Sequence, residues 1–434
     1  MLGLFLYFYF MNIEHLHKLF LKHPSVSTDT RKITKNDLYF ALKGDNFNGN
    51  AFTKQALENG ASYCIIDEEK FAINKQCILV VDVLETLQKL ATFHRTYLNL
   101  PIIGLTGSNG KTTTKELIHA VLSKKFKTSA TIGNLNNHIG VPLTLLKMNT
   151  NTEFGIVEMG ANHKKEIAFL SNIALPDYGL ITNFGKAHLE GFGSIEGVIE
   201  GKSEIYNHLI KHNKIIFINS NDPIQLEKSK EAKTITFGNK KTDDFEIHFK
   251  SAQPNVTVEF NNNEINSQLI GEYNFNNISV AIAIGAYFKV DEKLISEAIE
   301  NYSPKNNRSQ IVEKGTTKII LDAYNANPSS MKVALENFGK LEAENKIAIL
   351  GDMFELGQDA KKEHIAIAEQ ANSLNVLKVI FIGENFHEAI PKTNETYKTF
   401  NNFKEQFHLD TLKNATILIK GSRGMALERI LDLF

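Results

Sequence analysis

The sequence predicts an α/β protein with three domains, and three observations support the prediction. The chain has 434 residues, more than one hydrophobic core usually organises. Short apolar runs alternate with helical patterns, which is typical of sheets covered by helices. These runs fall into three blocks, so we predict domains at 1–98, 99–303 and 304–434.

The first block is expected to form a small mixed α/β domain that ends in a helix at 84–98. Cys64 and Cys77 lie in apolar strand-like runs. Two cysteines make neither a disulfide framework nor a metal site by themselves, so we expect core thiols in a reducing cytoplasm. The strand-like runs of this block are 37–42, 62–66 and 78–81.

The central block opens with a strand, a glycine-rich turn and a helix in direct succession. An apolar run at 101–105 precedes the turn TGSNGKTTTK at 106–115, and a helical pattern follows at 116–122. Glycines let backbone N–H groups approach phosphate oxygens, and the helix N-terminus adds positive partial charge. Lys111 is placed to reach the terminal phosphates, and the Thr112 hydroxyl to ligate Mg²⁺. We therefore predict a P-loop ATPase domain that binds ATP or GTP.

This loop departs from the strict phosphate-binding pattern. The pattern would place its first glycine at Leu105, whereas the nearby glycines are Gly104 and Gly107. An ordinary glycine turn is the alternative interpretation, but the flanking strand and helix favour nucleotide binding.

Further strands of the central block are apolar throughout, which predicts a mostly parallel sheet under helices. They are expected at 154–157, 179–182 and 215–218, and each is followed by a polar side chain. Such side chains lie at the edge where parallel sheets hold ligands. Residues 244–270 alternate apolar and polar side chains, which predicts an antiparallel insertion.

The last block predicts a C-terminal Rossmann-like open α/β domain without a second phosphate-binding loop. A polar stretch at 303–307 is expected to link it to the central domain. Polar turns at 322–331 and 420–424 follow two of its strands, at the position where open sheets bind ligands. The expected strands are 318–321, 347–350, 379–382 and 417–419.

Composition and charge exclude several classes of partner. The net charge is −1 at pH 7, so we expect no nucleic-acid partner. Residues 1–10 are apolar but shorter than the ~20 residues that span a bilayer, and they lack the features of a signal peptide. We expect translation to begin at Met11 and no stable membrane insertion; a short membrane-surface anchor is the alternative.

Several single residues are candidates for chemistry. Glu158 follows a strand expected beside the loop strand, where a carboxylate can hold Mg²⁺. His188 lies just past another strand end and is either structural or a ligand. Lys202, taken alone, resembles an exposed lysine on a helix. Asn274 and Asn277 open an apolar helix, and either could cap it or read a nucleobase edge.

In their order along the chain, these motifs resemble the ATP-dependent Mur ligase family, which builds the peptide of bacterial cell-wall precursors. The resemblance covers almost all of the chain after residue 24. It is strongest to members that join D-alanyl-D-alanine to UDP-N-acetylmuramoyl-tripeptide, through segments 40–44, 134–142, 322–328 and 351–357. The Asp-Asn-Pro-Arg motif typical of diaminopimelate-adding relatives is absent.

The resemblance implies two Mg²⁺ ions, one held by Thr112 and Glu158 and the other by His188 and a carbamylated Lys202. A carbamate makes physical sense there, because an ammonium repels Mg²⁺ whereas a carbamate offers oxygen ligands. Lys111, Lys202 and His188 are then the catalytic residues. The implied contacts to ATP come from Gly107, Ser108, Asn109, Gly110, Lys111, Thr112, Thr113, Asn277 (adenine), Arg308 (phosphates) and Asp322 (ribose).

The implied substrate contacts fall into three groups. The nucleotide-sugar site contains Asp29, Thr30 and Arg31; Asn136 and Asn137 line the peptide path; and Tyr324, Asn325 and Asn327 face the incoming dipeptide. The chain departs from the family at five positions. The family usually has Ser at Thr30, and it often has acidic residues at Asn48 and His138 and His at Asn50 and Tyr273.

The implied reaction forms an acyl phosphate from the tripeptide carboxylate and ATP, and the amine of D-alanyl-D-alanine then attacks it. A folylpolyglutamate-synthase-like or other Mur-type ligase is the nearest alternative; a P-loop kinase, a GTPase-like switch and a non-catalytic scaffold are more distant ones. We expect a cytoplasmic monomer. The third residue of the tripeptide, diaminopimelate or lysine, stays open.

Overall fold

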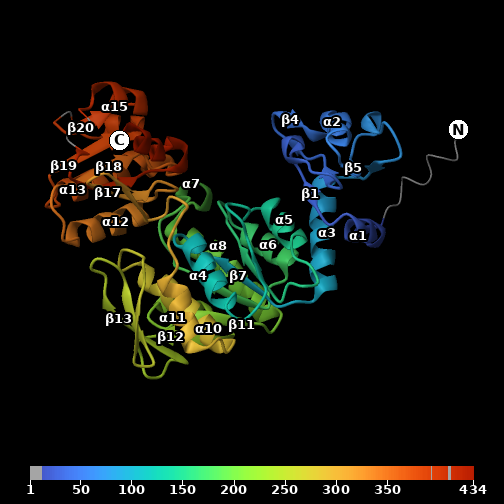
Figure 1. The fold of residues 1–434 in the computed structure, drawn as a ribbon, viewed down its shortest axis with the longest axis horizontal. Coiled ribbons are helices and arrows are strands. Elements are labelled where there is room, and N and C mark those ends of the chain that lie inside the picture. Colours follow the sequence, from blue (N-terminus) through green and yellow to red (C-terminus); the bar gives the residue numbers. More distant parts are fainter. Residues whose placement is uncertain (1–11, 392, 409–411) are drawn as a thin grey trace.

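The computed structural model describes residues 12–391, 393–408 and 412–434 (Figure 1). The predicted translation start at Met11 therefore lies outside the described residues. Among the described residues, three larger sheets form within 26–79, 102–266 and 310–420, and a two-stranded sheet forms within 43–48. The predicted α/β fold class with three domains is confirmed, and the domain limits 1–98, 99–303 and 304–434 remain a prediction. No helix among the described residues is long and apolar enough to cross a bilayer.

The N-terminal sheet is parallel, with strand order β1-β2-β5-β6. Cys64 and Cys77 face each other in register on its two last strands and are buried, as expected of core thiols. The elements are α1 (Ile13–Lys22), β1 (Val26–Ser27), β2 (Leu38–Phe40), β3 (Lys43–Gly44), β4 (Phe47–Asn48), α2 (Thr53–Glu58), β5 (Tyr63–Ile66), β6 (Cys77–Leu79) and α3 (Val83–Leu98).

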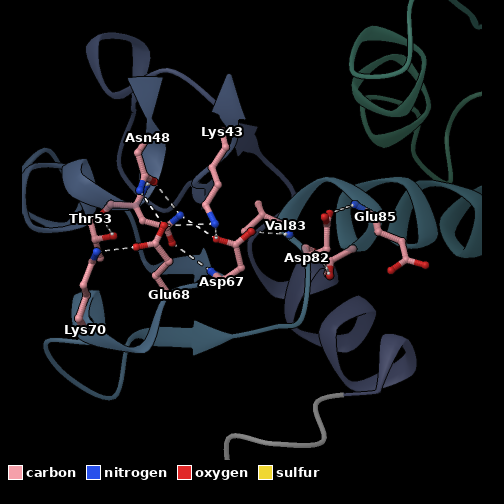
Figure 2. A network of polar contacts seen from close by, with 11 residues as sticks. Lys43, Asn48, Thr53, Asp67, Glu68, Lys70, Asp82, Val83 and Glu85 are labelled. Carbon is pink, nitrogen blue, oxygen red and sulfur yellow. Dashed lines mark hydrogen bonds and ion pairs between the residues drawn. The ribbon is translucent and has the colours of Figure 1, made fainter. Parts of the chain in front are cut away.

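A polar network secures the β3–β4 hairpin to the end of β5 (Figure 2). The Lys43 ammonium lies 2.8 Å from an Asp67 oxygen and 3.2 Å from a Glu68 oxygen. Asn48 donates to the same Glu68 at 2.7 Å, and Asn50 donates to Asp67 at 2.8 Å. The Asn48 and Asn50 amides thus serve as donors to carboxylates of the same domain.

Helix α3 joins the N-terminal domain to the central one through a shared hydrophobic core. Leu87 and Leu90 of α3 are fully buried in one cluster with Phe20 of α1 and Leu145 and Leu170 of the central domain. In Figure 1, α3 runs from the N-terminal lobe down beside α5 (Gly140–Leu146) and α6 (Glu166–Ala174). Burial of this shared core holds the two domains together, and polar bonds add to it, such as the ion pair between Arg95 of α3 and Asp177 at 2.6 Å.

The central sheet has strand order β15-β14-β13-β12-β11-β10-β7-β9-β8. It is parallel from β8 to β13, and β13, β14 and β15 form the predicted antiparallel insertion. Its strands are β7 (Ile102–Thr106), β8 (Thr128–Ala130), β9 (Phe154–Glu158), β10 (Tyr178–Ile181), β11 (Ile215–Asn219), β12 (Lys233–Gly238), β13 (Phe245–Ser251), β14 (Thr257–Phe260) and β15 (Asn263–Asn266). The other helices are α4 (Lys111–Leu122), α7 (Leu189–Phe192), α8 (Ile195–Lys211), α9 (Pro223–Lys228), α10 (Asn274–Tyr287) and α11 (Glu292–Glu300).

The C-terminal sheet has strand order β16-β17-β21-β18-β19-β20 and is parallel except for the β16–β17 pair. Edge strands β16 and β20 add to the four predicted strands. The elements are β16 (Gln310–Lys314), β17 (Thr317–Asp322), α12 (Pro328–Lys340), β18 (Lys346–Gly351), α13 (Ala360–Asn372), β19 (Lys378–Ile382), α14 (Glu384–Ala389), β20 (Glu395–Tyr397), α15 (Phe400–Gln406) and β21 (Thr416–Lys420). A hydrophobic cluster covers each face of this sheet.

Candidate active site

A cavity of about 730 Å³ lies between the central and C-terminal domains. The carboxyl ends of β7, β9 and β17 open onto it, which is where parallel sheets present polar side chains. It brings together most of the predicted site residues. Those that line it are Ser108, Asn109, Gly110, Lys111, Thr112, Thr113, Asn136, Asn137, Glu158, His188, Asn277, Arg308, Asp322, Tyr324 and Asn325.

The predicted phosphate-binding loop joins β7 to the N-terminus of α4. Gly107 has φ +145°, and a Cβ built on it would lie 2.0 Å from the Thr182 hydroxyl oxygen. Gly110 has φ +79°, and a Cβ built on it would lie 2.7 Å from the Asn277 amide oxygen. Both positions therefore require glycine. The Lys111 ammonium folds back and donates to the Gly107 carbonyl at 2.7 Å, and burial lowers the pKa of this lysine.

Glu158 and Thr112 form one polar corner of the cavity. The Thr112 hydroxyl donates to Glu158 Oε1 at 3.3 Å, and Asn136 Nδ2 donates to the same oxygen at 2.9 Å. Glu158 Oε2 is buried and makes no hydrogen bond. A buried carboxylate oxygen without a partner beside a phosphate-binding loop fits a site for a hard cation.

Lys202 of α8 is completely buried, so the interpretation as an exposed lysine is wrong. Its amine donates to the Ala161 carbonyl at 3.1 Å and lies 5.0 Å from the centroid of the Phe192 ring. Burial places the pKa of Lys202 well below its ordinary value of 10.5, and the nearby Lys111 lowers it further. A neutral amine is the form that reacts with carbon dioxide, so this environment fits a carbamate.

His188 precedes α7 on the loop after β10, with φ +52°. Its Nδ1 is hydrogen-bonded to Glu355 Oε2 of the C-terminal domain, and this bond holds the pKa of Glu355 below its usual range. Glu355 was not among the site residues predicted from the sequence. Among the described residues, no group of three or more His, Cys, Asp or Glu side chains is arranged to hold a metal.

The Asn274 and Asn277 side chains bond to each other rather than capping α10. Asn277 Nδ2 donates to Asn274 Oδ1 at 2.8 Å, and Asn277 Oδ1 accepts from the Thr114 hydroxyl at 3.0 Å. Asn274 Nδ2 donates to the Ile270 carbonyl at 2.8 Å. The Asn277 amide is thus fixed in the cavity wall, next to the loop glycine Gly110.

The C-terminal wall presents cationic and anionic groups. The Arg308 guanidinium stacks on the Tyr324 ring, 3.9 Å from its centroid, and its buried Nε has no hydrogen-bond partner. Asp322 accepts from the Ser309 backbone N–H at 3.2 Å and pairs with Lys420. This wall offers one aromatic face with a positive charge and one carboxylate held in a fixed orientation.

Two further predicted residues have structural bonds near the cavity. Asn327 caps α12, and its Nδ2 donates to Asn109 Oδ1 at 2.8 Å across the domain boundary. The Asn325 amide oxygen accepts from the Ala326 N–H. The phosphate-binding loop is therefore in direct contact with the turn that follows β17.

The predicted nucleotide-sugar residues are not part of this cavity. Asp29, Thr30 and Arg31 belong to the N-terminal domain, where Asp29 accepts two side-chain bonds from Arg31 at 2.8 and 2.9 Å. These bonds hold the pKa of Asp29 near 2. The Thr30 carbonyl accepts from Asn59 at 2.9 Å. The structure thus separates this triplet from the residues around the phosphate-binding loop.

Comparison with known proteins gives matches along most of the chain. The Mur ligase family catalytic domain matches residues 24–95, the Mur ligase middle domain residues 105–285, and the Mur ligase glutamate ligase domain residues 307–423. The UDP-N-acetylmuramoyl-tripeptide–D-alanyl-D-alanine ligase of Bacillus subtilis (strain 168) is 37% identical over 420 residues, covering 93% of this chain and 92% of the relative.

Solved structures are similar over the same extent. MurF from Acinetobacter baumannii has a TM-score of 0.84 at 28% identity and covers 94% of this chain and 92% of its own. MurF ligase from Thermotoga maritima, in complex with ADP, has a TM-score of 0.81 at 27% identity and covers 95% of this chain and 97% of its own. With three successive domains, a shared fold and a phosphate-binding loop in the middle domain, this chain belongs to the Mur ligase family.

Proposed function

We propose that this protein is an ATP-dependent ligase that joins D-alanyl-D-alanine to UDP-N-acetylmuramoyl-tripeptide in peptidoglycan precursor synthesis. One observation carries the proposal: a phosphate-binding loop and the polar turns of a second α/β domain line the same cavity of about 730 Å³. Such a cavity suits a reaction in which a nucleotide meets further substrates. The names of the relatives that are 37% and 28% identical support this ligase chemistry.

ATP occupies the loop side of the cavity in this proposal. Lys111 reaches the terminal phosphates once its bond to the Gly107 carbonyl is released, and Arg308 adds a second positive charge. Asn277 faces the adenine, and Asp322 the ribose. The remaining contacts come from the loop itself, at Gly107, Ser108, Asn109, Gly110, Thr112 and Thr113.

Thr112 and Glu158, whose buried Oε2 has no hydrogen-bond partner, would hold one Mg²⁺ ion, and His188 and a carbamate on Lys202 would hold a second. Two such ions would supply the positive charge that phosphoryl transfer requires. The lowered pKa of the Lys202 amine supports carbamylation, because the neutral amine is the nucleophile that carbon dioxide needs.

The reaction then proceeds in two steps. The terminal carboxylate of the tripeptide attacks the γ-phosphorus of ATP, and ADP leaves. The free amine of D-alanyl-D-alanine attacks the resulting acyl phosphate, an amide forms, and inorganic phosphate leaves. The chain contributes chiefly by orienting the reactants: Asn136 and Asn137 along the peptide path, and Tyr324, Asn325 and Asn327 toward the dipeptide.

The N-terminal triplet Asp29, Thr30 and Arg31 binds the nucleotide-sugar end of the substrate in this proposal. That assignment is consistent with the triplet not lining the cavity, because the tripeptide separates the sugar from the reacting carboxylate. We further propose domain limits at 1–98, 99–303 and 304–434 and a cytoplasmic monomer.

The test is phosphate release from ATP with UDP-N-acetylmuramoyl-tripeptide, with and without D-alanyl-D-alanine, with the product followed by mass. We expect release only with both substrates and a product heavier by one dipeptide. Release that depends on glutamate and a folate instead would identify the folylpolyglutamate-synthase-like alternative. Release without any acceptor would contradict a ligase.

A further inference from the structure

We propose that Glu355 of the C-terminal domain is a positioning residue for His188, so that docking of this domain completes the second metal site. The inference rests on the proposed function, in which His188 is a metal ligand. It starts from a single contact: His188 Nδ1 is hydrogen-bonded to Glu355 Oε2 across the domain boundary.

The chemistry of imidazole gives this contact its meaning. A neutral histidine has one N–H and one nitrogen with a free lone pair, and only the latter binds a metal. When Nδ1–H donates to the Glu355 carboxylate, the lone pair is left on Nε2. No described residue bonds to Nε2, and His188 lines the cavity. Carboxylates that hold the second nitrogen of a metal-binding histidine fix its tautomer and its ring orientation.

The backbone on both sides of the contact is adapted to it. His188 has φ +52° and Glu355 has φ +62°, in the left-handed region that residues with a Cβ rarely adopt. The two loops also meet through their backbones, because Glu190 N–H donates to the Glu355 carbonyl at 3.4 Å. Strained conformations persist where the surroundings over-determine them, and here each loop is held by the other.

The same boundary carries other polar contacts that do not touch His188. The Lys186 ammonium lies 2.7 Å from a Glu363 oxygen, and the Lys186 backbone N–H donates to the Ser329 hydroxyl at 2.8 Å. Opening of the domains would break these bonds and release Glu355 from His188 together. Glu363 therefore provides a matched control. It is an acidic residue in the same interface that contributes to docking through Lys186 and makes no contact with the His188 imidazole.

The experiment compares Glu355→Ala, Glu355→Gln and Glu363→Ala with the wild type. Mn²⁺ is titrated, with electron paramagnetic resonance as the readout, into protein loaded with a non-hydrolysable ATP analogue in bicarbonate buffer. The wild type should bind two Mn²⁺ per chain. Glu355→Ala should weaken one of them about 10- to 100-fold, the usual loss when a carboxylate behind a metal-binding histidine is removed. Glu355→Gln keeps an acceptor oxygen and should lose less, and Glu363→Ala should lose much less Mn²⁺ affinity than Glu355→Ala, because it leaves the bond between His188 and Glu355 in place.

Three outcomes would overturn the inference. They are equal Mn²⁺ affinity in Glu355→Ala and the wild type, an equal loss in Glu363→Ala, and a single bound Mn²⁺ in the wild type. The thermal midpoint of each variant identifies any that fails to fold, and Glu355→Gln then carries the comparison. Dipeptide-dependent phosphate release by the wild type is measured separately, so failure of the proposed function is distinguishable from failure of this inference.

Discussion

Lys202→Met should make the protein inactive and, over much of the alkaline range, more stable. Methionine has a similar length and no charge, so it can fill the same buried space. The replacement removes the bond from the amine to the Ala161 carbonyl, which costs about 1 kcal/mol. It also removes a second free-energy cost of folding: the wild type must release the Lys202 proton when the amine becomes buried, whereas the unfolded chain keeps that proton. This second cost depends on pH.

The sign follows from the lowered pKa of Lys202 in the folded state. Between that pKa and the ordinary value of 10.5, the unfolded chain binds more protons than the folded one, so lowering the pH destabilises the wild type. Each pH unit in this window changes the free energy of unfolding by about 1.4 kcal/mol. The variant lacks this effect. At about one pH unit below 10.5, the destabilisation of the wild type already equals the hydrogen bond that the variant has lost. Below that pH, the variant is the more stable protein.

The assay is guanidinium chloride unfolding followed by circular dichroism, in carbon-dioxide-free buffers at several pH values between neutral and 10. Guanidinium is preferred to urea because urea contains cyanate, which modifies lysines. A stability difference between the wild type and Lys202→Met that stays constant with pH would refute the reasoning, because it would mean that the buried amine keeps its proton. Bicarbonate labelled with ¹³C should give a carbamate signal in the wild type and not in the variant.

Two further predictions concern the loop and the N-terminal domain. Gly107→Ala should abolish ADP binding in calorimetry and lower the free energy of unfolding by about 2 kcal/mol or more, because its Cβ would lie 2.0 Å from the Thr182 hydroxyl oxygen. The control is Gly133→Ala, which has φ +58° and open space around its Cβ. It should lower the free energy of unfolding by only about 1 kcal/mol and leave ADP binding unchanged. The free energy of unfolding should also fall as the pH drops from 6.5 to about 4. Burial and the neighbouring His94 lower the pKa of His17 to about 4, so in this range His17 is protonated in the unfolded chain before it is protonated in the folded one. Unfolding of His17→Leu across this range should show a flatter profile, and an unchanged profile would contradict the assignment.

The sequence predicted the parts of the site that depend on neighbouring residues along the chain. A strand, a glycine turn and a helix at 101–122 fold locally, and their pattern predicted both the elements and the bound ligand class. The position of Glu158 could be predicted as well. A strand that is apolar on both faces lies inside a parallel sheet, so its polar carboxyl end lies at the same sheet edge as the carboxyl end of its neighbour β7.

Contacts between distant segments could not be predicted in this way. The burial of Lys202 comes from the packing of α8 against the Phe192 ring and the segment at Ala161, and its own stretch of sequence reads as an ordinary helix surface. Glu355 meets His188 from 167 positions away in the chain. Edge strands β16 and β20 were missed because short edge strands are defined by their pairing more than by their composition.

The two interfaces of the central domain differ in how much apolar core they share, and this difference indicates which domain moves. On the N-terminal side, buried side chains of α3 share one core with α5 and α6, and polar bonds such as Arg95 to Asp177 add to it. The C-terminal side relies largely on polar bonds, such as Asn327 to Asn109 and Lys186 to Glu363, with Ile270 as the central-domain residue in a C-terminal core. Polar contacts exchange for water at little net cost, whereas exposing a shared core costs about 25 cal/mol for each Å². We therefore expect the N-terminal and central domains to move as one body while the C-terminal domain opens to admit ATP and the dipeptide. An enzyme arranged in this way would form the acyl phosphate only when the domain that brings the amine is already docked.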